Sequence, residues 1–443
     1  MKSPRLSLAM VLSAVLLVSV VVNYAKSPVN PGISTASSLG TNSMVLYCTG
    51  LSSSKHHEAG LVTFQNTSGE ERTITVSVAS PDAPIASTKL TLKPYRTRTF
   101  NPGSISNGNY FGISAQFNGT GVIAQESVMN GMGVTPCIAS GARQWYGAGF
   151  DTKVGGMGAL SVYNPTGTPA VLNIVAFTPT GYVAPAPFQG LSIPAHAQQL
   201  IDLGTQVVDR ADIAVRVTVL RGSLVIAGVQ ESGSHVSLLT QSSPPQKSAT
   251  YSAISTAASA YSVIRLANTQ NRDVVAHVKV NDGVYGTVNL TVPVSAYSTA
   301  EASISPNTAI AAGGLVSVTV TSKRPIATSL ITGDAKGLTW LPSSASSSKV
   351  VVTDPLRIGY QSLVISNTSN KTIHVTETQL NAGALKTFYT IKAHGNLTFL
   401  AETRLTAPNS ATEFVASEAV LVATMVRASA PIGIYPVAPL YSR

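Results

Sequence analysis

Apolar and polar residues alternate with a period of two in a short segment that occurs four times along the chain. In each copy, two apolar residues placed two apart lead into an asparagine that is followed by small polar residues. Such alternation is typical of a half-buried strand that runs into a turn. The asparagines are Asn66, Asn164, Asn268 and Asn367, with spacings of 98, 104 and 99 residues. The spacing predicts one domain repeated four times.

The apolar pairs before these asparagines are expected to point into domain cores. They are Val62 and Phe64, Leu160 and Val162, Ile264 and Leu266, and Leu363 and Ile365. Two further landmarks recur in phase. One is the end of a β-run at a turn, at Lys93-Pro94, Ile193-Pro194, Val292-Pro293 and Ile391-Lys392. The other is a strand with an apolar pair and alanine, at Val122-Ile123-Ala124, Val225-Ile226-Ala227, Pro325-Ile326-Ala327 and Leu421-Val422-Ala423.

The first repeat contains seven strand candidates separated by Asn, Gly, Pro and Ser turns. They are Met44–Cys48, Gly60–Gln65, Arg72–Ala79, Ser87–Pro94, Arg98–Phe100, Tyr110–Phe117 and Gly121–Val128. Seven short strands in about a hundred residues is the number in an immunoglobulin-like sandwich. The predicted fold class is therefore all-β, with four tandem immunoglobulin-like β-sandwich domains after an N-terminal transmembrane or signal helix. The predicted domains are 1–25 (signal anchor or signal peptide), 26–42 (flexible spacer), and sandwiches at 43–138, 142–242, 249–341 and 349–443.

The N-terminus predicts export. Lys2 and Arg5 precede an unbroken run of apolar or small residues, Leu6 to Val22, and this order directs the rest of the chain across the membrane. The run has 17 residues, the lower limit for crossing a bilayer and long for the core of a signal peptide. Cleavage after Ala25 would need a small residue at Asn23. We favour an uncleaved signal anchor in a single-pass protein of the cell membrane; with a cleaved signal peptide the protein would be secreted.

Charge and composition agree with an extracytoplasmic β-protein. Only 11% of the residues are charged, against about 25% in ordinary soluble domains. The net charge of +10 is spread thinly, with no basic run longer than Lys323-Arg324, and this disfavours nucleic-acid binding. A diffuse positive charge either aids solubility or favours anionic envelope polymers and lipid headgroups.

Two cysteines, Cys48 and Cys137, lie at the two ends of the first repeat. In an oxidising compartment an even pair of this kind indicates a disulfide. The bond would close a loop in the unfolded chain, and in the chain-entropy model this stabilises the folded state by about 4–5 kcal/mol. A free, reactive or metal-binding pair is the alternative.

Candidate catalytic and metal-binding motifs fail on spacing or context. In Lys55-His56-His57-Glu58 the histidines are adjacent, whereas a zincin helix places them four residues apart. Two Ser-x-x-Lys sequences, Ser52 to Lys55 and Ser346 to Lys349, lie in polar stretches without helical periodicity. His196 and His394 sit two residues past the recurring turn, which favours a role in the turn over a shared site. No catalytic, cofactor-binding or metal residue is assigned, and no cofactor is expected.

The tryptophans are open to two interpretations. Trp145-Tyr146 and Trp340 are candidates for an exposed aromatic platform that binds sugars. However, Tyr47 precedes Tyr146 by 99 residues, the length of one repeat. An aromatic residue that recurs in phase is more typical of a packed strand position.

The N-terminal anchor, Leu46-Tyr47-Cys48, the closing Cys137, the recurring Asn turn and the strand Val122–Ser127 together resemble an actinobacterial family known only as a domain of unknown function. The resemblance implies an exported, membrane-associated protein built from tandem β-sandwich units. It covers nearly all of residues 43–443 and transfers no catalytic residue. This chain has less charge and less Trp than the resemblance implies.

Two classes of function remain. The first is a non-enzymatic envelope protein, a membrane-tethered rod of sandwiches that acts as a scaffold, spacer or adhesive module. The second is a cell-wall carbohydrate-binding accessory protein or a hydrolase. The expected partners are a cell-wall polymer or another envelope protein, with the cytoplasmic membrane contacted through the N-terminal helix.

Overall fold

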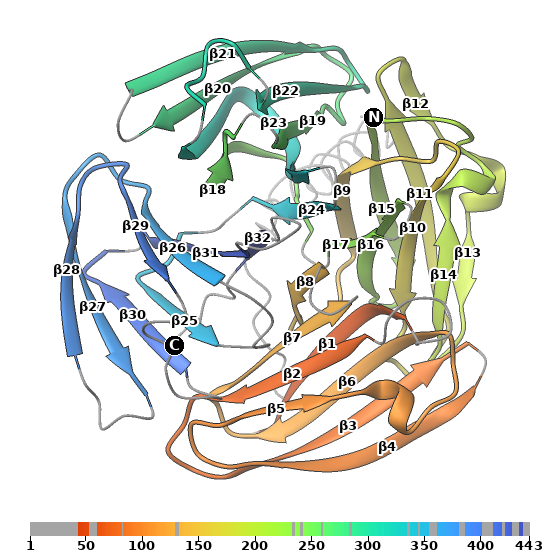
Figure 1. Ribbon diagram of the computed structural model, residues 1–443. Helices are drawn as coiled ribbons and strands as arrows, with labels where there is room; N and C mark the ends of the chain where they lie inside the picture. Colours follow the sequence, from red (N-terminus) through yellow and green to blue (C-terminus); the bar gives the residue numbers. More distant parts are fainter. Residues whose placement is uncertain are drawn as a thin grey trace, which may run out of the picture. The chain divides into compact units, whose positions relative to one another are not determined.

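The structure is a computed structural model of the full chain. It describes residues 43–52, 60–81, 83–128, 133–232, 235–239, 242–257, 260–282, 286–305, 307–312, 314–334, 337–343, 346–353, 361–380, 386–400, 411–418, 421–427 and 434–436. The described residues form strands joined by turns and short 3-10 segments (Figure 1). The protein is therefore all-β in this part, as its alternating pattern predicts.

Repeat one contains two four-stranded sheets, ordered β1-β6-β3-β4 and β5-β2-β7-β8. Its strands are β1 (Ser43–Ser52), β2 (Leu61–Asn66), β3 (Arg72–Ser80), β4 (Ala83–Leu92), β5 (Thr97–Phe100), β6 (Tyr110–Asn118), β7 (Val122–Val128) and β8 (Gly133–Pro136). The pattern in the sequence misses β8, because this strand is only four residues long and ends in proline. The expected seven strands are thus eight.

The later repeats follow the same plan. Repeat two has β9 (Gln144–Phe150), β10 (Gly156–Tyr163), β11 (Ala170–Thr178), β12 (Gly181–Val183), β13 (Leu191–Ile193), β14 (Gln198–Asp202), β15 (Ile213–Arg221), β16 (Val225–Ser232) and β17 (His235–Leu239). Repeat three has β18 (Gln246–Ser255), β19 (Tyr261–Ala267), β20 (Val274–Asp282), β21 (Gly286–Val294), β22 (Thr299–Ser305), β23 (Leu315–Asp334) and β24 (Gly337–Pro342). Repeat four has β25 (Lys349–Thr353), β26 (Gln361–Asn367), β27 (Ile373–Gln379), β28 (Lys386–Ile391), β29 (Asn396–Leu400), β30 (Ala411–Ala416), β31 (Leu421–Arg427) and β32 (Ile434–Pro436).

The strand order departs from that of an immunoglobulin constant domain. There the first strand lies beside the second, and the seventh lies beside the sixth. Here β1 pairs with β6, and β7 pairs with β2. Repeats two and four keep this exchange, and in repeat three the long β23 serves as both the sixth and the seventh strand. The repeats are therefore β-sandwiches that share a strand order different from that of the immunoglobulin constant domain.

The apolar pairs before the recurring asparagines lie in the cores, as predicted. Phe64 and Leu266 are fully buried, and so are the other described members of the four pairs; the side chain of Leu363 lies outside the described part. The strands are nevertheless not half-buried. On β2 the intervening Thr63 and Gln65 are buried as well, and on β10 so is Ser161. For β10 the reason is that the outer face of its sheet packs against the preceding repeat.

Each recurring asparagine joins two turns through its side chain. Asn164 Nδ2 donates to the carbonyl of Thr168 at 2.8 Å and to those of Ile193 and Pro194, while its Oδ1 accepts the backbone N–H of Thr166 at 3.0 Å. The equivalent contacts are made by Asn66, Asn268 and Asn367. A fully buried amide with its donors and acceptor satisfied explains why asparagine recurs here.

The second of these turns contains a residue with positive φ in every repeat. Tyr95, His196, Tyr297 and His394 have φ between 52° and 56°. Each donates its backbone N–H to the loop that follows the asparagine. His196 and His394 are therefore turn residues, as their spacing predicts.

The predicted alignment of the repeats slips at several landmarks. The turn carbonyls that meet the asparagine are those of Leu92 and Lys93 in repeat one and of Val294 and Ser295 in repeat three, rather than Lys93-Pro94 and Val292-Pro293. The apolar-pair strand is also displaced by one residue in repeats two and three relative to repeat one. Only the pairing between strands fixes this register.

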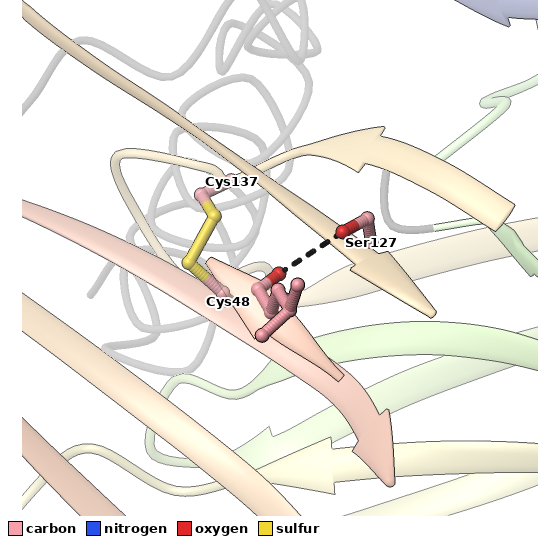
Figure 2. Close-up of a disulfide and its surroundings, with 4 residues drawn as sticks. Cys48, Ser127 and Cys137 are labelled. Carbon is pink, nitrogen blue, oxygen red and sulfur yellow. Dashed lines mark hydrogen bonds between the residues drawn. A yellow bond between two sulfur atoms is a disulfide. The ribbon is translucent and has the colours of Figure 1, made fainter. Parts of the chain in front are cut away.

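Cys48 and Cys137 form a disulfide (Figure 2). Their Cα atoms are 4.7 Å apart, and the bond closes a separation of 89 residues. It links β1 to the residue that follows β8, so it joins the two ends of repeat one as predicted. Beside it, Ser127 Oγ on β7 donates to the Leu61 carbonyl of β2.

The described residues of the four repeats belong to one compact unit, so the repeats are not independent domains joined by linkers. The predicted signal anchor, the spacer and the Lys55–Glu58 cluster lie outside the described residues. In the described part of the chain, no helix has the length and apolar character needed to span a membrane.

Candidate functional site: the junctions between repeats

The junctions begin at a β-bulge in the first strand of a repeat. In β1 the pairing with β6 shifts at Gly50, and in β9 the pairing with β15 shifts at Gly149. Both glycines have positive φ, 109° and 107°, which a residue with a Cβ rarely adopts. A Cβ at Gly50 would lie 3.1 Å from Leu238 of repeat two, and one at Gly149 would lie 2.5 Å from Ile331 of repeat three. Because glycine has no side chain, the bulge lets side chains of the next repeat pack directly against the backbone.

We define an exit face on one repeat and an entry face on the next. The exit face of repeat one consists of Tyr47, Thr49, Gly50, Ala79 and Gly112, and the entry face of repeat two consists of Ser161, Tyr163, Val225, Ala227 and Leu238. The equivalent residues at the second junction are Tyr146, Ala148, Gly149, Phe177 and Ala214, facing Arg265, Ala267, Ala327, Ser329 and Trp340. Matching strand pairs place all ten positions in the same register.

The first junction is centred on Tyr163, and the residues of its two faces are all uncharged. Its ring lies over Gly112, where a Cβ would come within 2.5 Å of the tyrosine Cγ. Tyr47 meets the same ring edge-on, with centroids 6.4 Å apart. Next to it, the hydroxyls of Thr49 and Ser161 are hydrogen-bonded at 2.8 Å, and Gln198 Nε2 donates to Ser161. One hydrogen bond, between Thr49 and Ser161, thus crosses an otherwise apolar contact.

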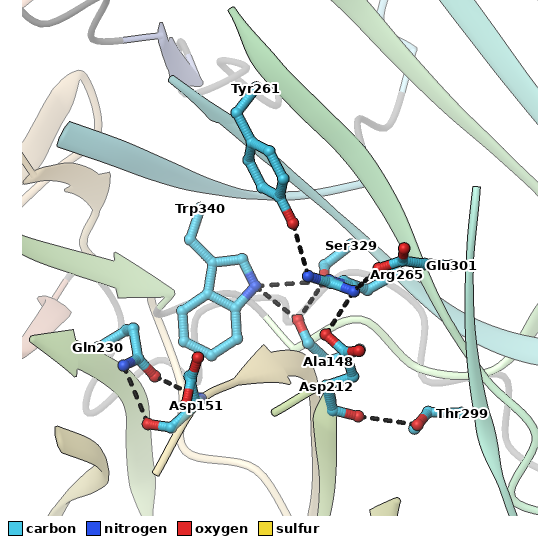
Figure 3. Close-up of polar contacts among 10 residues, drawn as sticks. All are labelled: Ala148, Asp151, Asp212, Gln230, Tyr261, Arg265, Thr299, Glu301, Ser329 and Trp340. Atoms are coloured by element: carbon cyan, nitrogen blue, oxygen red, sulfur yellow. Dashed lines mark hydrogen bonds and ion pairs between the residues drawn. The ribbon is translucent and has the colours of Figure 1, made fainter. Parts of the chain in front are cut away.

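The second junction is anchored by Trp340 (Figure 3). The indole N–H donates to the carbonyl of Ala148 at 2.7 Å, and Ser329 Oγ donates to the same carbonyl. The ring packs edge-on against Phe150, with centroids 4.5 Å apart, and it also covers Gly228. Trp340 is 3% exposed and belongs to the core of repeat two. The interpretation as an exposed sugar platform is wrong for this residue, and also for Trp145, which is buried in its own repeat.

An ionic cluster completes the second junction (Figure 3). Arg265 of repeat three pairs with Asp212 of repeat two and with Glu301 on its neighbouring strand, and Tyr261 Oη lies 2.8 Å from its guanidinium. The Arg265 side chain is only 11% exposed. Burial raises the pKa of Asp212; Arg265 opposes this shift, Glu301 and Asp151 add to it, and Lys153 opposes it. The pair is thus partly desolvated, and its strength depends on both partners staying in place.

One backbone hydrogen bond recurs at the second and third junctions. The carbonyl of Asp212 accepts the Thr299 hydroxyl at 2.8 Å, and the carbonyl of Leu315 accepts Asn396 Nδ2 of repeat four at 3.4 Å. Both carbonyls lie at the same position relative to the exit strands, and both donors begin the same entry strand. The third junction therefore follows the plan of the second.

Glu126 is a buried acid that sequence reasoning did not single out. It lies opposite Val62, on the core side of β7, and is fully buried. Burial raises its pKa well above the usual range, and the Thr49 N–H lowers it in part although no hydrogen bond is completed. Repeat two has Gly228 at this position, opposite Leu160. No signal in the sequence separates Glu126 from a solvated strand glutamate, because its face depends on register.

The other sequence motifs do not converge on a site. Ser346 is exposed, and Lys349 begins β25 and pairs with Glu413 at 2.7 Å, so this Ser-x-x-Lys lies on a strand. Among the described residues, no three His, Cys, Asp or Glu side chains are grouped so as to hold a metal ion. The arrangement shown by the described side chains is packing between repeats.

Residues 120–401, more than half of the chain, match the model of a family described as a family of unknown function, DUF5719. The chain belongs to the DUF5719 family. The matched segment includes both faces of the second junction. No curated protein matches the chain. A solved tetra-tandem repeat from the extending region of a large adhesion protein is 11% identical; the alignment covers 90% of this chain and 100% of that chain, with a TM-score of 0.13. A likeness at that TM-score carries no argument here.

Proposed function

We propose that this protein is a non-enzymatic component of the cell envelope, tethered to the cytoplasmic membrane by Leu6–Val22. Its four sandwiches act as a scaffold, spacer or adhesive module outside the membrane. The proposal rests on the recurring junction, in which equivalent faces of successive repeats are buried against the neighbouring repeat. The extended rod expected from the sequence does not fit the described part of the chain, because β32 of repeat four packs against β8 of repeat one within one compact unit.

Three further observations support this function. The disulfide fits an oxidising compartment outside the cytoplasm. The charged fraction of 11% is low for a cytosolic protein. The buried tryptophans are used for structure. The expected partner is a cell-wall polymer or another envelope protein, and the actinobacterial source and export implied by the resemblance belong to this proposal.

The tether is tested by fractionating cells that express the full chain with a C-terminal epitope. We expect the protein in the membrane fraction after alkaline extraction, with the epitope cleaved by protease added to intact spheroplasts. Leu16→Arg should abolish export, and Ser13→Thr serves as the matched control. An intact mass that includes Met1 or Lys2 indicates an anchor, and a shortened N-terminus indicates a cleaved signal peptide. A protease-protected epitope in the wild type would contradict the proposal.

The scaffold role is tested by incubating the detergent-solubilised full chain with isolated cell walls and with wall-free membranes. Cosedimentation with walls, or crosslinking to one envelope protein, is the expected result. Release of soluble sugar or peptide from the walls would favour the hydrolase instead. Small-angle scattering of the same sample in contrast-matched detergent should give the profile of a compact particle, and an extended, rod-like profile would contradict the packing of the repeats.

A further inference from the structure

The central positions of the junctions differ from one junction to the next, although their places in the fold are the same. On the exit side, the central pair is Ala79 and Gly112 in repeat one, Phe177 and Ala214 in repeat two, and Asn281 and Ser317 in repeat three. On the entry side, it is Tyr163 and Val225 in repeat two and Ala267 and Ala327 in repeat three, and in repeat four the first position is Ser366.

Size is complementary across the first two junctions. At the first, the exit side is small and the entry side carries the ring of Tyr163, which occupies the space that a Cβ on Gly112 would fill. At the second, the exit side carries the ring of Phe177 and the entry side carries two alanines, in one buried cluster. Each junction therefore holds one aromatic ring at this point, contributed by opposite sides.

Polarity is complementary at the third junction. Asn281 and Ser317 on the exit side and Ser366 on the entry side are all buried. Ser366 donates to Asn396 Oδ1 at 2.7 Å, and Asn396 in turn donates to the Leu315 carbonyl of repeat three. The contact from Asn396 to Leu315 crosses the junction, and the polar groups at the central positions would be desolvated against an apolar face, at a cost in free energy.

We propose that the junction faces form a set of mutually exclusive pairs, so that each exit face accepts only the entry face of the next repeat in the same chain. The partner of each face is thus a specific repeat, and a repeat from any other position is rejected. A Phe177 exit face that met a Tyr163 entry face would place two rings where each junction holds one. If the entry face with Arg265 packed against an exit face that lacks Asp212, Arg265 would keep Glu301 and Tyr261 but lose the carboxylate of the preceding repeat.

The experiment rebuilds the first junction at the place of the second, in the full chain. Ala267→Tyr puts a second ring against Phe177, and we expect protease cleavage between repeats two and three to become roughly ten- to hundredfold faster, because overpacking favours the open junction. Adding Phe177→Ala and Ala214→Gly should restore the wild-type rate, since the triple variant reproduces Ala79, Gly112 and Tyr163. Val275→Tyr, at an exposed position on β20, is the matched control.

Light scattering after size exclusion provides a second readout, because an open junction exposes apolar surface that promotes association between copies. We expect Ala267→Tyr to form dimers and higher oligomers, and the triple variant to return to the mass of the wild type. If Ala267→Tyr does not fold, recovery of folded protein by the triple variant still supports the proposal. Equal cleavage rates for the wild type and Ala267→Tyr, or a triple variant no better than the single, would overturn it.

Discussion

The first and second junctions occupy the same positions but use different chemistry. The first joins neutral surfaces, with Tyr163 over a glycine and a pair of hydroxyls beside it. The second buries a tryptophan and an arginine whose partners lie in both repeats. The sandwich and its β-bulge therefore set where repeats touch, while side-chain volume and charge set which repeats touch. Targeted substitutions separate these two contributions.

The largest effect is expected from the disulfide, which strengthens only the repeat that precedes the first junction. Cys48 is followed directly by Thr49 and Gly50 of the exit face. Replacing both cysteines by serine should lower the free energy of unfolding of repeat one by about 4–5 kcal/mol, because the unfolded loop is no longer closed. Hydrogen exchange should show this loss in β1 to β8 and no change in β18 to β24. A loss spread evenly over the repeats would mean that the junctions, and not the bond, limit stability.

Trp340→Ala should open the second junction and leave the first intact. Removing a buried tryptophan from between two repeats should cost about 3–5 kcal/mol. Trp340→Phe keeps a smaller ring near Phe150 but loses the indole N–H and part of the buried ring, so it should cost less than alanine, about 1–3 kcal/mol. Denaturant unfolding of both variants measures these costs. Equal costs would show that the hydrogen bond to Ala148 dominates over the packing.

Arg265→Met should weaken the second junction by about 1–3 kcal/mol, because Asp212 loses its partner in a partly desolvated place. The wild-type junction should also weaken as salt rises from 0.1 M to 1 M, since the screening length falls from about 10 Å to about 3 Å. The first junction, whose face residues are uncharged, should respond less. Hydrogen exchange at the two junctions measures both effects. Arg72→Met, which removes an ion pair with Glu70 inside repeat one, is the control.

Glu126→Gln should stabilise the protein at neutral pH. Because burial raises the pKa of Glu126 in the folded state, the folded protein holds a proton that the unfolded chain releases. Stability is therefore greatest below the usual glutamate pKa and falls as pH rises toward the raised value. The amide has no such proton, so the advantage of Glu126→Gln should grow with pH to roughly 1 kcal/mol or more. Parallel pH profiles for the two proteins would contradict the shift, and the exposed Glu71→Gln is the control.

Much of the fold is predictable because the same pattern of apolar residues and turns occurs in four copies. The turn asparagines, the buried Phe64 and Leu266, the turn histidines and the pairing of Cys48 with Cys137 all follow from spacing. The short β8 was missed because four residues that end in proline carry too little alternation. The landmark strands were misaligned by one residue because adjacent apolar residues, as at Val225-Ile226, allow either to face the core. Strand pairing decides between them, and a one-residue slip reverses every side chain.

The local features of this protein follow from its sequence alone. Alternation buries one face of a strand, asparagines close the turns, and two cysteines are placed so that a disulfide can join the ends of one domain. These depend on residues that are near one another in the chain or that recur at a fixed period. Three contacts follow from the tertiary structure and not from the sequence pattern. Trp340 packs into the core of the preceding repeat, Arg265 pairs with Asp212, and Glu126 faces the core of its repeat. The reason is physical: the outer face of a sheet has no periodic pattern of its own, so whether it meets water or another repeat depends on the partner's shape and charge.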